Sequence, residues 1–249
     1  MIQAADIEAI ERATLAAVAP DEVLEIEGWL VGLDPGTIRR AASAVPLSHN
    51  LPHDPAVLDA IEAAYRSRGL SPAFRVADAP GLEAVRAELT RRGYGFEQPT
   101  LVKTATVVAV RAVTDRDPAE VADRPDDAWA AVFLGEGFDP VDGAYRVKAL
   151  SRSPGAAYGA VREGEAALAV GAGAFGHGWV SFHGMRTDAA RRGEGLAGRV
   201  LAGLAGEAAA RGIDRAFLQV EEKNAAARSL YARAGFTPAW RYFYWSRTA

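Results

Sequence analysis

A short glycine-containing segment, Arg192-Gly193-Glu194-Gly195-Leu196-Ala197, lies between a predicted strand and a predicted helix. Small residues at such a junction let backbone N–H groups face a ligand, and the helix N-terminus adds about half a unit of positive charge. Both properties favour the binding of a pyrophosphate. The pattern alone is weak, because many glycine-rich turns before helices are plain loops. It also lacks the Gly-Lys-Ser/Thr of a Walker loop, and its R-x-x-G-x-A spacing differs from the dinucleotide fingerprint.

A second segment, about 30 residues further on, strengthens the interpretation of this loop as a ligand site. The strand end Leu218-Gln219-Val220 is followed by Asn224 and by a helix that carries Leu230-Tyr231 and ends at Gly235-Phe236. In this order and spacing, the two segments resemble the GNAT superfamily of acyl-CoA-dependent N-acetyltransferases. An aromatic last strand, residues 240–245, also fits, and the resemblance covers about residues 126–249. The whole chain further resembles a two-part subgroup, whose N-terminal half has a Gly-Trp-Leu strand (here residues 28–30) and a degenerate acetyltransferase-like domain.

The resemblance implies that acetyl-CoA is the co-substrate and that its pyrophosphate lies on the glycine loop. The loop residues that would contact it, chiefly through backbone N–H groups, are Arg191, Arg192, Gly193, Gly195, Ala197 and Gly198. For Arg191 a solvated surface charge is an equally good interpretation. Met185 and Thr187, on the strand before the loop, would meet the pantetheine amides. Asn224 would either contact coenzyme A or simply cap its helix.

The same resemblance assigns catalytic roles. Tyr231 matches the general acid that protonates the departing thiolate, and the backbone N–H near Met185 would stabilise the oxyanion. The base is less clear, because the strand before the loop offers Trp179, Ser181 and His183 but no carboxylate. His183 could accept a proton near neutral pH and Ser181 could act as a relay. Two carboxylates after the next strand, Glu221 and Glu222, are further candidates.

The elements that must position these residues alternate between strands and helices, which predicts an α/β (α+β) fold with mixed, mostly antiparallel sheets flanked by helices. The expected helices are 6–17, one opened by Asp54-Pro55 and closed by Gly69, 81–92, 128–134, 140–150, 193–211 and 225–234. The expected strands are 23–33, 38–45, 72–77, 100–110, 156–162, 166–173, 179–186, 216–221 and 240–246.

An internal echo at an offset of about 143 residues predicts two related halves. Residues 68–76 (RGLSPAFRV) are similar to residues 211–220 (RGIDRAFLQV), and each segment is followed by a helix that ends in glycine and an aromatic residue. We expect a degenerate GNAT-like domain at 1–112, a linker at 113–127 and an acetyltransferase domain at 128–249. The linker assignment rests on its acidic residues and its two prolines.

The first half lacks the glycine loop and is expected to bind no coenzyme A. The polar residues Arg39, Arg40, Ser48, His49 and Asn50 are placed where the counterpart of the cofactor loop would be. They form either an ordinary polar loop or one wall of the acceptor pocket, since ligand sites favour domain interfaces. For the aromatic side chains Trp29 and Trp179, a place in the core is favoured over a place in a pocket.

Composition excludes several classes of protein. The chain has 249 residues, no cysteine and a formal charge of −4. Because it has no cysteine, it has no thiolate nucleophile, which predicts direct attack in a ternary complex. The four histidines lack the spacing of a zinc site, so no metal is expected. Mild acidity argues against a nucleic-acid partner. Residues 1–14 are acidic and amphipathic rather than signal-like, and no apolar run could span a membrane, which predicts a cytoplasmic protein.

These observations predict an acetyl-CoA-dependent N-acetyltransferase that acts on a primary amine of a small molecule or an amino acid. The main alternative is a catalytically silent acyl-CoA-binding or regulatory module, because no base is evident. A transferase that uses a larger donor such as aminoacyl-tRNA is disfavoured by the intact loop and the low basicity. The protein is expected to be a monomer or a homodimer.

Overall fold

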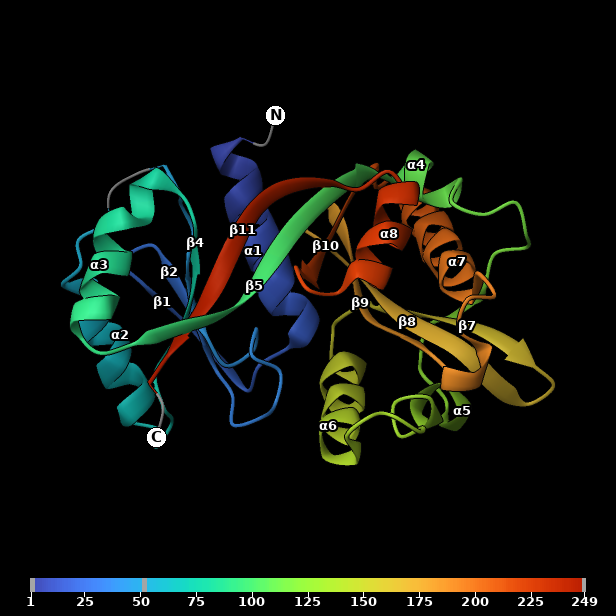
Figure 1. Ribbon diagram of the computed structural model, residues 1–249, viewed down its shortest axis with the longest axis horizontal. Helices are drawn as coiled ribbons and strands as arrows, with labels where there is room; N and C mark the ends of the chain where they lie inside the picture. The colour runs from blue at the N-terminus through green and yellow to red at the C-terminus, as the bar shows by residue number, and fades with distance from the viewer. Residues whose placement is uncertain (1–2, 51–52, 248–249) are drawn as a thin grey trace.

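The computed structural model describes residues 3–50 and 53–247, and its strands form one continuous sheet of eleven strands in the order β1-β2-β3-β4-β11-β5-β10-β9-β8-β7-β6 (Figure 1). The strands are β1 (Glu22–Ile26), β2 (Trp29–Leu33), β3 (Ala44–Pro46), β4 (Ala73–Ala77), β5 (Gly95–Thr106), β6 (Glu120–Ala122), β7 (Ala157–Glu163), β8 (Ala166–Gly176), β9 (Trp179–Thr187), β10 (Arg215–Glu221) and β11 (Thr237–Ser246). The helices are α1 (Ala4–Val18), α2 (Val57–Arg66), α3 (Glu83–Arg91), α4 (Val107–Arg111), α5 (Asp127–Ala131), α6 (Pro140–Ser151), α7 (Leu196–Ala210) and α8 (Ala225–Arg233), with short 3-10 turns at Pro80–Leu82 and Ala189–Arg191.

The sheet is mostly antiparallel and flanked by helices, as the sequence predicts. The parallel pairs among the described strands are β3 with β4 and β9 with β10. The two segments that echo each other in sequence form the same succession of elements, α2-β4-α3-β5 and α7-β10-α8-β11. The parallel pair therefore occupies a corresponding position in each half of the chain.

The last strand of each succession pairs with the other half of the chain. Strand β11 lies between β4 and β5, and β5 lies between β11 and β10 (Figure 1). The register sets Thr100 of β5 opposite Glu221 of β10 and opposite Tyr242 of β11. The division at residues 113–127 stays a prediction, and backbone hydrogen bonds of β11 and β5 link the segments on its two sides.

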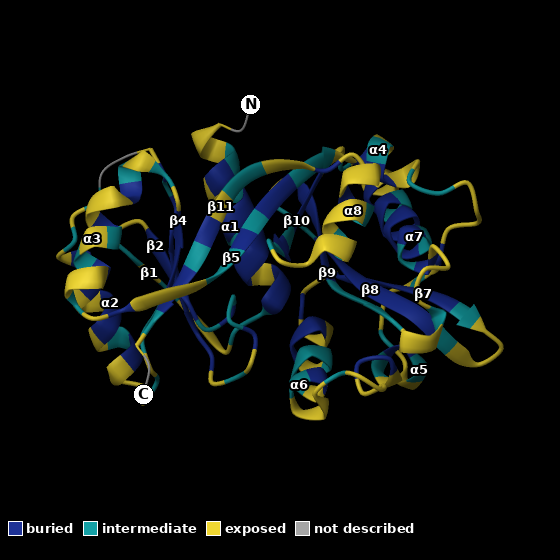
Figure 2. Cartoon of the chain, viewed as in Figure 1, coloured by how far each residue is buried: buried dark blue, intermediate teal, exposed yellow. Residues whose placement is uncertain are grey.

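Burial follows the predicted amphipathic patterns (Figure 2). Helix α7 packs on β7, β8 and β9. The five residues that its helical period places on one face are buried, namely Leu196, Val200, Leu201, Leu204 and Ala208. Trp29 and Trp179 are both buried in one apolar cluster. That cluster combines side chains from the first half with Phe217 and Tyr242 of the second half, so the core also joins the two parts of the chain.

Helix α1 runs across the centre of the molecule (Figure 1) and contacts β8, β9 and α6. Its Glu11 forms an ion pair with Arg75 of β4, with 2.6 Å between Oε2 and a guanidinium nitrogen, and both side chains are at most 1% exposed. The Arg75 guanidinium lies 5.1 Å from the centre of the Tyr242 ring. Burial raises the pKa of Glu11 although Arg75 lowers it. This buried pair holds α1, β4 and β11 together.

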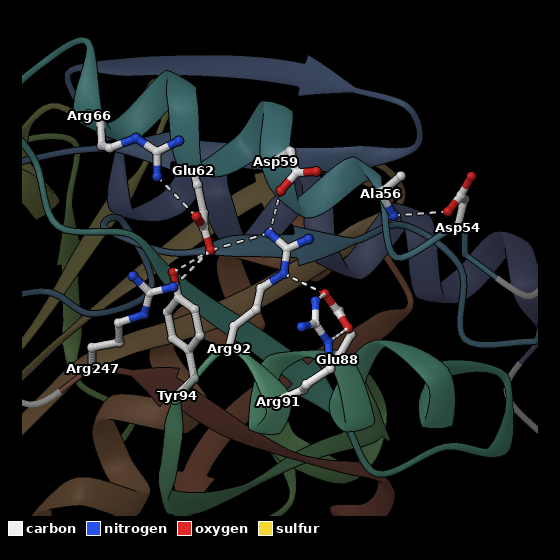
Figure 3. A network of polar contacts seen from close by, with 10 residues as sticks. All are labelled: Asp54, Ala56, Asp59, Glu62, Arg66, Glu88, Arg91, Arg92, Tyr94 and Arg247. Carbon is white, nitrogen blue, oxygen red and sulfur yellow. Dashed lines mark hydrogen bonds and ion pairs between the residues drawn. The ribbon is translucent and has the colours of Figure 1, made fainter.

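The C-terminal end of β11 is tied to α2 and α3 by a polar network (Figure 3). Glu62 accepts a hydrogen bond from the Tyr94 hydroxyl at 3.0 Å, and Arg66 and Arg247 pair with it at 2.9 and 3.3 Å. Arg92 reaches the Asp59 carboxylate at 2.6 Å and Glu88 at 2.7 Å. These arginines have acidic partners within the network, which gives it a structural role.

The first expected strands are interrupted. Residues 23–33 form a hairpin, because Glu27 and Gly28 turn the chain with φ values of 46° and 79°. The expected strand 38–45 shortens to β3. Before it, the Ala41 N–H bonds back to the Ile38 carbonyl at 2.8 Å, which closes a turn in place of strand pairing.

Three further boundaries also differ from expectation. The strand expected to end at residue 110 ends at Thr106, whose hydroxyl caps α4 by accepting from the Ala109 N–H. The expected linker contains β6, which pairs with β7 at the edge of the sheet. The helix expected from residue 193 begins at Leu196, because Gly193 and Gly195 have positive φ values. No helix within residues 3–50 and 53–247 is long and apolar enough to cross a membrane.

Candidate active site

Strands β9 and β10 diverge at the centre of the sheet. They pair in parallel where residues 216–218 face residues 180–182, and the pairing ends there. On its other side β9 bulges, since the register with β8 shifts between Val170 and Ala172. Gly184 permits the bulge with a φ of 59°, and a Cβ there would lie 2.6 Å from Leu150 Cδ1. The divergence opens a gap between the two strands that leads to the glycine loop.

The glycine loop leaves the start of α7 available to a ligand. Gly193 and Gly195 adopt φ values of 87° and 79°, a region that residues with a side chain rarely enter. Among the described side chains, none caps α7 at Gly195, whereas the Asn224 side chain caps α8 by accepting from the Ala227 N–H at 3.1 Å. The first N–H groups of a helix have no partner within the helix. At α7 these donors therefore suit an anion.

A cavity of about 580 Å³ lies in front of this loop. All ten residues predicted to contact coenzyme A line it: Met185, Thr187, Arg191, Arg192, Gly193, Gly195, Ala197, Gly198, Asn224 and Tyr231. Phe138, Leu196, Ala226, Ala227 and Leu230 add apolar lining. The free N–H donors at the start of α7 and the volume of this cavity fit a ligand that carries a pyrophosphate.

The two loop arginines differ in their partners. Arg191 is held by Glu194 and Glu163, at 2.8 and 2.9 Å, which agrees with the interpretation as a surface charge. Arg192 is exposed, and its guanidinium lies 5.8 Å from the centre of the Phe138 ring. Within the described part of the chain Arg192 has no hydrogen bond or ion pair, so its charge is the more available one for a phosphate.

A second cavity, of about 470 Å³, lies on the other side of Tyr231. It shares Met185, Arg186, Asn224, Ala227 and Tyr231 with the first cavity. Its other walls come from the loop before β3, from α6 and from strands β5, β9, β10 and β11. These lining residues are Thr37, Ile38, Arg39, Arg40, Gln98, Thr100, Arg146, Phe182, His183, Gly184, Gln219, Val220, Glu221, Tyr242 and Tyr244. Residues of the first half thus form one wall of this second cavity, and its use as an acceptor pocket stays a prediction.

The five polar residues of the first half do not act together. Arg39 and Arg40 precede β3 and line the second cavity, whereas Ser48, His49 and Asn50 follow β3 and line neither of the two cavities. His49 is buried with its ring 5.1 Å from that of Trp240, and burial lowers its pKa to about 4. Placing all five at the counterpart of the cofactor loop was wrong, because β3 separates the two groups.

Tyr231 lies where the two cavities meet. Its side chain is 8% exposed, and burial raises its pKa to about 12 although the nearby Arg40 lowers it. Its hydroxyl is therefore protonated at neutral pH. It has no hydrogen-bond partner among the residues that the structure describes. The group can donate a hydrogen bond to an atom placed at the junction of the cavities.

Ser181 and His183 form a hydrogen-bonded pair, with 2.7 Å between the His183 Nε2 and the Ser181 Oγ. Ser181 is buried, lines neither cavity and donates to the Ala174 carbonyl at 3.4 Å. His183 lines the second cavity. Burial and, secondly, Arg40 lower its pKa to about 3, so its imidazole is neutral at pH 7. The pair can hold a hydrogen-bonding group in place, but its protonation near neutral pH is unfavourable.

The two candidate carboxylates lie on different elements, because β10 ends at Glu221 and Glu222 begins the turn that follows it. Glu221 lines the second cavity, where it accepts from the Gln98 amide at 2.8 Å and pairs with Lys223 at 3.1 Å. Glu222 lines neither cavity and lies 3.8 Å from Arg241. Sequence reasoning missed Arg146, Arg186, Tyr242 and several neighbours in this wall. The alternation of Tyr242 with Tyr244, and of Gln219 with Glu221, is a signal that could have suggested a shared face.

A diverging parallel strand pair, an uncapped helix behind a glycine loop and a tyrosine between two cavities define a GNAT-type acetyltransferase, which is an acyltransferase. The sequence matches, over residues 4–245, the model of the family described as "Probable histone acetyltransferase Rv0428c C-terminal", and the chain belongs to that family. None of the curated proteins matches the sequence.

Solved structures share this fold at low identity. A GCN5-related N-acetyltransferase from Kribbella flavida has a TM-score of 0.73 at 17% identity, covering 97% of this chain and 95% of that one. An acetyltransferase of the GNAT family from Novosphingobium aromaticivorans gives 0.58 at 15%, covering 97% and 99%. A tandem GNAT protein from the clavulanic acid biosynthesis pathway gives 0.58 at 13%, covering 96% and 94%. These similarities extend over both halves of the chain.

Proposed function

We propose that this protein is an acetyl-CoA-dependent N-acetyltransferase that transfers the acetyl group to a primary amine of a small molecule or an amino acid. The observation that carries the proposal is the meeting of two cavities at Tyr231, one of them at the uncapped start of α7. Coenzyme A would occupy the first cavity and the acceptor the second. No group of three or more His, Asp or Glu side chains within the described residues could hold a metal ion, and the proposed reaction uses none.

The proposed reaction is direct attack. The amine nitrogen adds to the thioester carbonyl carbon, and the backbone N–H near Met185 stabilises the oxyanion. Collapse of this intermediate breaks the carbon–sulfur bond, and Tyr231 donates its proton, or a hydrogen bond, to the leaving sulfur. The proton lost by the amine passes to Glu221, directly or through a water molecule.

Replacing Tyr231 with phenylalanine is expected to lower kcat by about tenfold to a hundredfold and to leave the KM for acetyl-CoA unchanged. The loss is moderate because a thiolate with a pKa near 8.5 leaves fairly well unaided. Steady-state kinetics with a thiol reagent measure both constants. Tyr158→Phe is the matched control, since that hydroxyl donates to the Leu150 carbonyl away from both cavities. An unchanged kcat in Tyr231→Phe would remove the assigned role.

Glu221 is preferred over His183 as the proton acceptor because it is a carboxylate in the acceptor cavity, whereas protonation of His183 is opposed by burial and by Arg40. We expect Glu221→Gln to lower kcat about a hundredfold at pH 7. We expect His183→Asn to have a smaller effect and to leave the pH profile between 5 and 9 unchanged, since a pKa of about 3 lies below that range.

Glu222→Gln serves as the control for Glu221→Gln, because it removes a neighbouring carboxylate that lines neither cavity. Full pH–rate profiles of the three variants and the wild type decide between the two groups. If His183→Asn loses more activity than Glu221→Gln and shifts the profile, the pair Ser181–His183 is the proton acceptor instead.

Two measurements on the same protein distinguish an active enzyme from a silent acyl-CoA-binding module. The proposal predicts that acetyl-CoA raises the unfolding temperature and that at least one amine of a broad panel releases coenzyme A thiol. Stabilisation without thiol release for any amine supports the silent module. The absence of any stabilisation contradicts both functions.

The description of the family as a probable histone acetyltransferase suggests a second candidate acceptor, the lysine side chains of histones. Incubation with histone proteins and labelled acetyl-CoA tests it, with free amino acids as the competing acceptors. The tandem organisation, the cytoplasmic location, and the monomeric or homodimeric state are also part of the proposal, and they rest on the sequence.

A further inference from the structure

The acceptor cavity is rich in arginine. Four arginine side chains line it, Arg39, Arg40, Arg146 and Arg186, against one carboxylate, Glu221. Such a wall attracts anions and repels cations over the short distances inside a cavity, where the field is poorly screened. The charge that each arginine offers to a ligand depends on its partners within the protein.

Three of the four arginines have acidic partners within the protein, although two of them share one carboxylate. Arg39 pairs with Glu97 at 3.0 Å and lies 4.2 Å from the centre of the Tyr244 ring. Asp142 binds the other two, Arg146 at 2.6 Å and Arg186 at 3.7 Å. These ion pairs hold the side chains in the wall and reduce the charge that they offer to a ligand.

Arg40 is different. Among residues 3–50 and 53–247 it has no ion pair, and its buried Nε has no hydrogen-bond partner. A buried guanidinium nitrogen without a partner costs free energy, which a ligand with acceptor oxygens would recover. The loop that carries Arg40 is held by the turn bond from the Ala41 N–H to the Ile38 carbonyl, so the charge is held in position before any ligand arrives.

The position of Arg40 fits an acceptor with two functional groups. It lies near Tyr231, Tyr242 and His183, since its charge acts on all three. Glu221 lies in the same cavity and suits the amine end of a ligand. An amine that also carries an anionic group could therefore meet Glu221 with one end and Arg40 with the other.

We propose that the acceptor is an anionic amine, with a carboxylate or phosphate beside its primary amine, and that the Arg40 guanidinium binds this anionic group. The inference rests on the proposed acetyltransferase function. It makes free amino acids or phosphorylated amines better acceptors than lysine-rich histone segments, whose positive charges the wall would repel. A bidentate guanidinium contact suits both oxyanions.

The test compares acceptors with and without an anionic group. Amino acids are assayed beside their carboxamides, phosphoethanolamine beside ethanolamine, and a histone peptide beside both, by thiol release with saturating acetyl-CoA. We expect kcat/KM to be at least tenfold higher for the charged member of one pair. The pair that shows the higher kcat/KM for its charged member identifies the anionic group as a carboxylate or a phosphate. Equal or better turnover of neutral or basic amines overturns the proposal while leaving the acetyltransferase function in place.

Variants locate the effect at Arg40. Arg40→Gln should raise the KM for the anionic acceptor at least tenfold and leave the KM of its neutral analogue unchanged, and Arg40→Lys should restore part of the loss. Arg68→Gln, which removes a surface arginine paired with Glu22, is the matched charge control. If Arg40→Gln lowers kcat equally for charged and neutral acceptors, Arg40 acts on the leaving group and the proposal fails.

A binding measurement covers the case in which no acceptor in the panel is turned over. With coenzyme A present, small dicarboxylates or inorganic phosphate should raise the unfolding temperature of the wild type and not that of Arg40→Gln. Absence of this difference overturns the anion site. Absence of stabilisation by acetyl-CoA itself contradicts the proposed function instead, so the two failures are distinguishable.

Discussion

Replacing Gly195 with glutamate is expected to weaken acetyl-CoA binding by at least about a thousandfold, or about 4 kcal/mol. Gly195 has a φ of 79°, where a residue with a side chain costs about 1–2 kcal/mol. The new carboxylate would also stand at the uncapped start of α7, where it takes up the N–H groups and repels the pyrophosphate. Titration of acetyl-CoA by calorimetry or by the shift of the unfolding temperature measures the loss.

Gly212→Glu is the matched control for Gly195→Glu. Gly212 follows the other end of α7 with a φ of 73°, and at both glycines an added Cβ would meet no described heavy atom within 4 Å. The two variants thus carry similar backbone strain and the same added charge, at opposite ends of one helix. Normal acetyl-CoA binding by Gly195→Glu, or an equal loss in Gly212→Glu, would contradict the assignment of the loop as the pyrophosphate site.

Replacing Arg75 with methionine is expected to lower the free energy of unfolding by about 3–5 kcal/mol, because it leaves the buried Glu11 carboxylate without its partner. Both side chains of this pair are at most 1% exposed, so water cannot replace the lost charge. Glu11→Met should have a similar effect by leaving Arg75 unpaired. Urea unfolding of the variants measures both costs.

The double variant Glu11→Met, Arg75→Met completes a double-mutant cycle with the two single variants. It should recover much of the stability that either single variant loses, since no uncompensated charge then remains. Arg68→Gln again serves as the comparison, because its pair with Glu22 lies at the surface and should contribute little to the free energy of unfolding. A loss below 1 kcal/mol in Arg75→Met would show that the pair does not hold α1 on the sheet.

Most elements were predictable because their signals are local. The apolar period of α7, the Asn224 cap of α8 and the strand patterns of residues 156–186 each depend on neighbours in sequence. The errors fall where distant contacts decide. Residues 38–43 contain an apolar and polar mixture that suits a strand, but the ladder with β2 begins at Ala44, and before it the Ala41 N–H closes a turn on the Ile38 carbonyl. The three-residue strand β6 forms by pairing with β7, and its own composition does not predict this pairing.

For the site, the sequence by itself determined the residues of the first cavity, where we propose that coenzyme A binds. The glycine loop, Asn224 and Tyr231 lie within 40 residues on consecutive elements, so their spacing alone implies one cradle, and all ten predicted residues line one cavity. The acceptor side was decided by the tertiary structure. Its wall brings Arg40 and Gln98 beside Glu221 because β5 and β11 pair with the other half of the chain. Such pairing depends on backbone hydrogen bonds between segments more than 100 residues apart, such as Leu101 opposite Val220. No local pattern encodes that choice of partner.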